Sequence, residues 1–160
     1  MYSIKVRENI LIAHSLPGEV FGPAQNMHGA TYLVDAEFFT DKLNKYNIIM
    51  DLGIVSTTLK DILRIYNYQN LDEIDEFKGK ITSTEFLAED ICNKILNRLR
   101  NEFSEDYKSL KKIKITLQES NVAWASYEKR GYLKINLIFF LFIQEILMQK
   151  LEDTFMKKIS

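Results

Sequence analysis

Apolar and polar residues alternate along the first part of the chain in two stretches, residues 2–12 and about 31–39, and each stretch predicts a β-strand. Between them lie residues 15–29, which hold five of the eight glycines and prolines in the chain. A loop of this length inside a compact domain usually carries function. The sequence therefore predicts a long, hairpin-like excursion between two strands.

In the middle of the chain the apolar repeat changes to helical spacing. Residues 52–66 carry an apolar side chain at every third or fourth position, directly after Asp51, which is a suitable N-cap. Residues 82–85, Thr-Ser-Thr-Glu, have the spacing of a capping box and predict the start of a second helix. Two further alternating stretches, 112–119 and 122–127, predict strands that close the domain. The predicted order is β-β-α-α-β-β, an α+β domain.

Composition narrows the class of protein. The chain has 160 residues, of which 46% are hydrophobic and 27% charged, as in ordinary globular domains. A net charge of −1 gives no electrostatic reason to expect a nucleic-acid partner. The single cysteine excludes an internal disulfide. Charges are interleaved with apolar residues at the N-terminus, so we expect this segment not to be a signal peptide. We therefore expect a cytoplasmic protein.

The last part of the chain differs from the rest. We expect a domain over residues 1–128 and an apolar, helical C-terminal tail over 129–160. Between Lys134 and Glu145 lie ten residues without charge, roughly half of what a membrane-spanning helix needs. We therefore expect a helix that packs against the domain or a neighbouring subunit. A membrane-surface anchor is the alternative interpretation.

Both histidines of the chain flank the long loop. His14 ends the first strand region and His28 precedes the second, so a hairpin would bring the two imidazoles together. Imidazole is a common zinc ligand, but catalytic zinc usually takes three protein ligands. Glu19, in the same loop, is a candidate for the third ligand. The alternative is that the histidines only hydrogen-bond the loop and that Glu19 is solvated.

A glutamate stands at the end of the third predicted strand. Glu119 shares the alternation of Ile113, Ile115 and Leu117, so it is predicted to point to the apolar side of the sheet. An unpaired carboxylate buried there would be unfavourable by several kcal/mol. A ligand with adjacent N–H donors would satisfy it by a bidentate hydrogen bond. The alternative is a glutamate at a frayed strand end.

Several short motifs, taken in their order and spacing, resemble the 6-pyruvoyl- and 6-carboxytetrahydropterin synthase family over about residues 2–127. They are Ala13-His14, His28-Gly29, Asp51-Leu52-Gly53, Asn70-Leu71-Asp72, Ser83-Thr84-Glu85, and Glu119 with Tyr127. The resemblance implies the tunnelling fold, with two helices on one face of a four-stranded antiparallel sheet. It also implies a barrel-shaped homo-oligomer, commonly a hexamer, with ligand sites between subunits.

The resemblance further implies an activity. The family converts dihydroneopterin triphosphate into a 6-substituted tetrahydropterin in a zinc-dependent lyase reaction, and the 6-carboxy product leads to queuosine. In this chain the resemblance assigns binding of the pterin ring to Glu119, with Ser83 and Glu85 at the start of the second helix. It assigns zinc binding to His14 and His28.

The chain departs from the family at the positions that carry chemistry. The third histidine of the metal motif is replaced by Ala30, and the family's cysteine by Ala24. Asn67 and Tyr68 stand where the family has an Asp-His pair. None of these side chains titrates near neutral pH without strong perturbation, so the catalytic residues stay unassigned.

Two functional hypotheses follow. The first is a synthase-like enzyme that acts on dihydroneopterin triphosphate or a related pterin with a changed catalytic set. The second is a pterin- or purine-binding oligomer of the same fold that has altered or lost catalysis. Product formation separates the two hypotheses, and metal content shows whether the histidines hold zinc.

Overall fold

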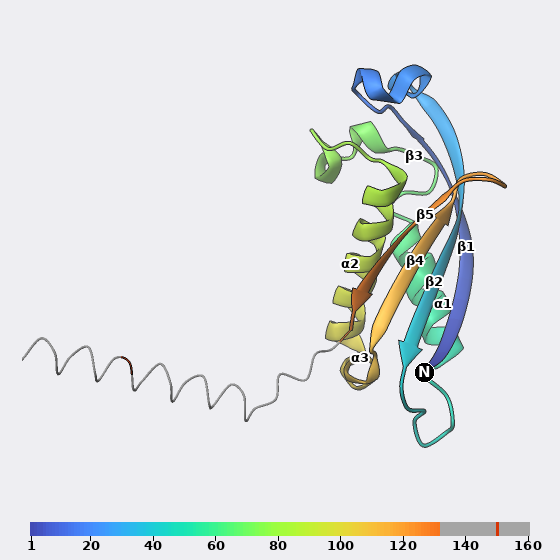
Figure 1. Ribbon diagram of the computed structural model, residues 1–160, viewed down its shortest axis with the longest axis vertical. Coiled ribbons are helices and arrows are strands. Elements are labelled where there is room, and N and C mark those ends of the chain that lie inside the picture. Colours follow the sequence, from blue (N-terminus) through green and yellow to red (C-terminus); the bar gives the residue numbers. More distant parts are fainter. Residues whose placement is uncertain (132–149, 151–160) are drawn as a thin grey trace, which may run out of the picture.

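A twisted β-sheet covered on one face by helices makes up the part of the chain that the computed structural model describes, residues 1–131 and 150 (Figure 1). The strands run in the order β3-β1-β2-β4-β5 across the sheet. The elements are β1 (Tyr2–His14), η1 (Glu19–Gln25), β2 (His28–Thr40), α1 (Leu52–Leu63), β3 (Gln69–Asn70), η2 (Leu71–Glu73), η3 (Asp75–Phe77), α2 (Thr84–Glu102), α3 (Ser104–Ser109), β4 (Lys112–Gln118) and β5 (Trp124–Arg130).

The predicted four-stranded antiparallel arrangement is confirmed, and a short fifth strand is added to it. β1, β2, β4 and β5 pair antiparallel in turn, while β3 pairs parallel to β1 at the edge of the sheet. The prediction of four strands was therefore one too few. β3 has only two residues, which is too short to produce a recognisable alternation in the sequence.

The two main helices begin where the sequence places them, with one change of cap. Asp51 is the N-cap of α1, as predicted. The capping box predicted over 82–85 is wrong, because Ser83 and not Thr82 caps α2 by accepting a hydrogen bond from the backbone N–H of Phe86. Thr82 is instead buried and contacts His14.

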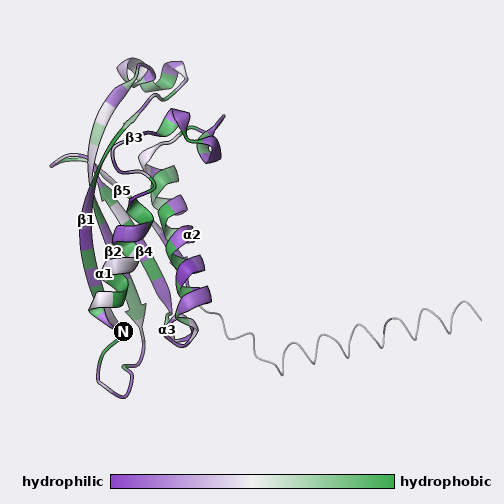
Figure 2. Cartoon of the chain, turned by 180° about the vertical axis from the view of Figure 1, so that it is seen from behind, coloured by the Kyte–Doolittle hydropathy of each residue, from purple (hydrophilic) through white to green (hydrophobic). Residues whose placement is uncertain are grey.

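The core lies between the helices and the sheet. Alternate residues of β2, β4 and the second half of β1 are buried against apolar stripes of α1 and α2. Figure 2 shows that the outward side of α2 is hydrophilic. Since burial of apolar area is the main favourable term in folding, this layer fixes which face of the sheet the helices cover. The largest fully buried side chains include Tyr32, Tyr66, Phe38, Phe77 and Ile10.

Most of the predicted tail lies outside the described residues. The described chain continues past the expected domain end at residue 128, because β5 runs to Arg130 and the Gly131 N–H donates to the carbonyl of Lys111. The helix expected within residues 132–160 is not part of the described structure. Among the helices that are described, none is long and apolar enough to cross a membrane.

The cap of α1 gives a first testable prediction. Asp51 Oδ1 accepts from the N–H groups of Gly53 and Ile54 at 2.7 and 3.1 Å. We expect Asp51→Ala to lower the free energy of unfolding by about 1 kcal/mol, because the first turn loses both acceptor contacts. Urea unfolding measures this effect. Asp51→Asn keeps an acceptor and serves as the control; an equal loss in both variants would contradict the capping role.

Candidate functional site

The two histidines meet at the end of the β1–β2 hairpin. His14 is the last residue of β1 and His28 the first residue of β2, and the two are direct partners in the antiparallel ladder. Their side chains therefore lie on the same face of the sheet. The ring centroids are 4.6 Å apart, with the ring planes at 54°. The prediction that the loop brings both imidazoles together is confirmed.

Each histidine is oriented by a backbone carbonyl. His14 Nδ1 lies 3.1 Å from both the carbonyl oxygen and the hydroxyl of Thr82, and His28 Nδ1 lies 2.9 Å from the carbonyl oxygen of Asn26. A carbonyl oxygen only accepts, so Nδ1 of each ring donates to it and Nε2 is the nitrogen left to face a metal. Metal-binding imidazoles are commonly oriented in this way.

The surroundings of His14 favour the neutral form of its imidazole. Burial lowers the pKa of the His14 imidazole below its ordinary value of 6.5, and His28 lowers it further. The hydrogen bond to Thr82 and the charges of Asp72 and Glu119 raise the pKa and only partly offset this shift. His14 is therefore a neutral imidazole at neutral pH.

The lowered pKa predicts a pH dependence of stability. In the unfolded chain His14 binds a proton near pH 6.5, and in the folded chain it does so only at lower pH. The unfolded state thus binds more protons in that window, so the free energy of unfolding falls as the pH drops below about 6.5. Chemical unfolding at several pH values measures this slope. A His14→Gln variant is expected to show a shallower slope, and an identical slope would contradict the assignment.

A third metal ligand is missing beside the pair. Ala30 follows His28 on the same face of β2 and offers only a methyl group. Glu19 lies exposed in η1. Within residues 1–131 and 150, no group of three His, Cys, Asp or Glu side chains that could hold a metal ion is found. The structure thus brings the two histidines together and does not gather Glu19 with them. Two imidazoles do not fit the three-ligand catalytic zinc that the resemblance implies.

Glu119 lies at the same end of the sheet, directly after β4. Its Oε2 accepts a hydrogen bond from the Thr84 hydroxyl at 3.2 Å, which places it on the helix-covered face, as predicted. The Tyr32 hydroxyl lies 3.2 Å from Thr84 Oγ1. Because the Thr84 proton goes to Glu119, Tyr32 donates to Thr84. Glu119 is nevertheless exposed, because the alternation of the strand fixes only the face on which it lies and nothing in the described chain covers the strand end.

Two further predicted ligand-binding residues flank Thr84 at the start of α2. Ser83 caps the helix through its hydroxyl oxygen, and Glu85 is exposed in the first turn. The pKa of Tyr32 is raised, mainly by its burial and in part by the charges of Glu119 and Glu85. The structure therefore brings Ser83, Glu85 and Glu119 to one end of α2, and their ligand role stays a prediction.

The residues at the family's catalytic positions have structural contacts. The carbonyl of Ala24 accepts from the Leu16 N–H at 3.0 Å. Asn67 Oδ1 accepts from the Leu11 N–H at 3.0 Å, and the Tyr68 N–H donates to the Leu11 carbonyl at 2.7 Å. Asn67 and Tyr68 thus pair with the edge of β1, and the Tyr68 ring is 77% exposed. These contacts give none of the three side chains a proton-transfer role.

Sequence reasoning missed three side chains that shape the site. Thr82 orients His14, Thr84 orients Glu119, and Tyr32 orients Thr84. The two threonines look like ordinary helix-start residues in the sequence, and Tyr32 looks like an alternating core residue. The one available signal was spacing, since Tyr32 follows His28 by four positions and therefore shares its face of β2.

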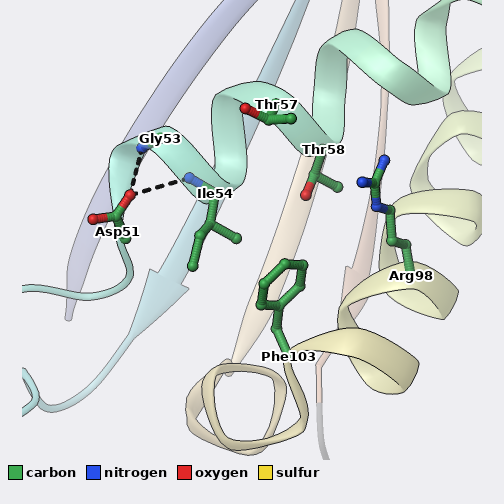
Figure 3. A pocket seen from close by; sticks show the side chains of 7 residues that line it. All are labelled: Asp51, Gly53, Ile54, Thr57, Thr58, Arg98 and Phe103. Atoms are coloured by element: carbon green, nitrogen blue, oxygen red, sulfur yellow. Dashed lines mark hydrogen bonds between the residues drawn. The ribbon is translucent and has the colours of Figure 1, made fainter.

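Two cavities lie at opposite ends of the helix layer. The larger, about 320 Å³, lies between the start of α1, which Asp51 caps, and the end of α2 (Figure 3). Arg98, which lines this cavity, pairs with Asp61 and Glu102. The charged groups of the cavity are therefore already engaged. The smaller, about 250 Å³, includes Ser15 and Asp72, next to His14. We take the histidine end as the candidate site, because the residues predicted from the sequence gather there.

Asp72 fixes the chain as it leaves β1. Its Oδ2 accepts from both the N–H and the hydroxyl of Ser15, at 2.9 and 2.6 Å. The charge of Asp72 also raises the pKa of His14. The candidate site therefore combines two imidazoles with carboxylates from three separate segments, Asp72, Glu85 and Glu119.

Comparisons with known proteins agree with this arrangement. The family model described as 6-pyruvoyl tetrahydropterin synthase matches residues 3–130. No curated protein matches the chain. Among solved structures, the 6-pyruvoyl tetrahydropterin synthase of Caenorhabditis elegans is 19% identical, with a TM-score of 0.68, over 80% of this chain and 95% of that one. The synthase of Plasmodium falciparum is 14% identical, with a TM-score of 0.67, over 81% and 98%. At these identities the structures support the fold.

Proposed function

Since the chain belongs to the 6-pyruvoyl tetrahydropterin synthase family, we propose that it binds a pterin or purine-like ring through Glu119 without carrying out the ordinary synthase reaction. The observation that carries the proposal is the hydrogen-bonded series from Tyr32 through Thr84 to Glu119, which holds a carboxylate in place at the start of α2. The missing base and the missing third metal ligand support the second half of the proposal.

The contacts of Glu119 suit ring recognition. A carboxylate has two oxygens with about four acceptor positions, and Thr84 occupies one of them on Oε2. The remaining positions accept the adjacent N–H donors of a 2-amino-pyrimidine edge in a bidentate hydrogen bond. Because Glu119 is exposed, it can meet a ligand without first breaking a buried ion pair.

The residues that replace the family's catalytic side chains argue against the ordinary synthase reaction. That reaction needs a proton removed beside a carbonyl and a Lewis-acid metal. Ala24 has no titratable group. Asn67 carries an amide whose oxygen accepts a hydrogen bond from Leu11 at the edge of β1. Tyr68 is a phenol, a poor base near neutral pH. The described residues supply neither a general base at these positions nor three metal ligands.

We also propose that this protein works as a homo-oligomer, with the hexamer of the family as the expected assembly, and that it is cytoplasmic. The exposed position of Glu119 supports the first point, because a neighbouring subunit would cover a ligand bound there. The rival function is a synthase acting on dihydroneopterin triphosphate in pterin or queuosine biosynthesis. Family membership favours that rival.

One experiment separates the two functions. The purified protein is incubated with dihydroneopterin triphosphate and added zinc, and products are identified by mass spectrometry, while binding of dihydroneopterin is measured in parallel. The proposal predicts that dihydroneopterin binds and that no tetrahydropterin is formed. Formation of a tetrahydropterin at catalytic turnover would contradict the proposal and establish the synthase.

A further inference from the structure

We propose that the apolar run at residues 137–143 of the C-terminal tail docks on its own domain, in the cavity of about 320 Å³ between the start of α1 and the end of α2. The docked run would place aromatic side chains beside Ile54 and Phe103, which line that cavity. The tail leaves the domain beside the start of β4, whereas Glu119 follows its end, so the inference goes beyond the proposed ring binding.

The tail carries an apolar run that needs a partner surface. Residues 137–143, Leu-Ile-Phe-Phe-Leu-Phe-Ile, are seven consecutive apolar residues and hold three of the ten phenylalanines of the chain. Folded proteins avoid exposing apolar runs of more than about three or four residues unless the run binds something. The family model ends at residue 130, so the run lies outside the domain shared with the family.

The cavity between α1 and α2 offers an apolar lining. Ile54 from the first turn of α1 and Phe103 from the end of α2 point toward each other across it (Figure 3). Its charged groups, Asp51 and Arg98, are engaged in a helix cap and in ion pairs. Leu52, next to the cavity-lining Asp51, is 58% exposed. The cavity and its rim therefore present uncovered apolar surface.

The tail begins within reach of this cavity. The Gly131 N–H donates to the carbonyl of Lys111, and Gly131 lies so close to Leu110 that a side chain would not fit there. In the sequence α3 joins Phe103 to Leu110, and its six residues rise about 9 Å. Residues 132–136 can span up to about 16 Å. Because this tether is short, the effective concentration of the run at its own cavity is roughly millimolar, which favours docking within the chain.

Charges beside the cavity favour the same placement. Burial raises the pKa of Asp106 in α3, and the charges of Asp51 and Glu105 raise it further. Three carboxylates therefore lie near one another at this end of the domain. Lys134 is the only charged residue of the segment 132–144. A tail that runs past α3 to the cavity would bring the Lys134 ammonium close to these carboxylates, which attract it.

Disulfide cross-linking of the full-length protein tests the docking. Thr57 lines the cavity and is exposed, so Thr57→Cys is combined with one cysteine at each of residues 137–143 in turn. A disulfide forms only between residues whose Cα atoms come within about 7 Å. We expect disulfides within one chain at positions three or four apart, because a docked helix presents one face at that spacing. The native Cys92 does not compete, because it is buried and its pKa is raised.

The matched control is Val20→Cys, combined with the same tail cysteines. Val20 is 87% exposed in η1, at the far end of the sheet (Figure 1), and we expect it to form no disulfide with the tail. Disulfides between two chains would assign the cavity to the tail of a second copy and overturn the inference. Absence of disulfides with Thr57→Cys, or equal yields at all seven tail positions, would overturn it as well.

A second variant tests the docking without new cysteines. Thr57→Arg places a long cationic side chain at the cavity and should expel the run, while α1 is retained because Thr57 is exposed and arginine is a good helix former. We expect chymotrypsin to cleave after the phenylalanines of the run about tenfold faster, or more, in Thr57→Arg than in the wild type. Val20→Arg should match the wild type.

Equal cleavage rates in the wild type and in Thr57→Arg would overturn the docking. Protection of the wild-type run only when vesicles of anionic lipid are added would assign the run to a membrane surface, which would also overturn it.

Discussion

Ala30→His is expected to give this protein a zinc site roughly 100-fold stronger, or more, than that of the wild type. Ala30 lies on the same face of β2 as His28, and His28 is the ladder partner of His14. A third imidazole at this position would complete a three-histidine set beside two rings whose Nδ1 atoms are already fixed by carbonyls. Losing only the groups that orient a zinc ligand costs about 10- to 100-fold in affinity, so adding a whole ligand has a larger effect.

Zinc titration of the metal-free protein, with metal content checked by mass spectrometry, measures this change. Thr31→His is the matched control, because residue 31 is the next position on β2, is exposed, and faces the opposite side of the sheet. Equally tight zinc binding by the wild type and by Ala30→His would show that another ligand completes the site. In that case, loss of zinc from Glu19→Ala would identify Glu19 as the third ligand.

Glu119→Gln is expected to weaken binding of the pterin by tenfold or more. Both oxygens of the carboxylate can accept hydrogen bonds from the N–H donors of the ring. The amide of the introduced glutamine has one N–H donor of its own, which would face a ring N–H donor. Hydrogen bonds to charged groups contribute about 1.5–3 kcal/mol, and about 1.4 kcal/mol corresponds to a tenfold change. Because the Glu119 carboxylate is exposed and accepts a hydrogen bond from the Thr84 hydroxyl at 3.2 Å, which an amide oxygen can also accept, the substitution should leave the fold intact.

The test compares dissociation constants for dihydroneopterin in the wild type, in Glu119→Gln and in Glu128→Gln. Glu128→Gln makes the same chemical change on β5, where the carboxylate pairs with Lys112, so it controls for the loss of one negative charge. Its affinity should equal that of the wild type. Unchanged affinity in Glu119→Gln would remove Glu119 from the binding site.

Much of the fold was predictable because burial imposes a period on the sequence. The alternation over 2–12 and 31–39 placed β1 and β2, and with them the meeting of His14 and His28. Asp51 was predictable as a cap because a carboxylate before an apolar helical repeat has a defined partner, the N–H groups of the first turn. These features depend on contacts between neighbours in the chain or on which face of a strand is buried.

Other features depend on contacts that no local pattern records. β3 exists because Tyr68 and Asn67 meet Leu11, more than fifty positions earlier in the chain. Ser83 caps α2 because Thr82 is drawn into the interior by His14, a choice that the Thr-Ser-Thr run leaves open. The alternation of side chains along β4 predicted the face on which Glu119 lies. Its exposure depends on what covers the end of the strand, and the alternation carries no information about that.

The measurement that tests the central claim most directly is a calorimetric titration of dihydroneopterin into the purified, full-length wild-type protein. The account predicts saturable binding with one ligand per chain, because the Glu119 carboxylate is held by Thr84 at the start of α2 with acceptor positions left for the ring. Absence of binding up to about 1 mM, equivalent to less than about 4 kcal/mol of binding free energy, would contradict it.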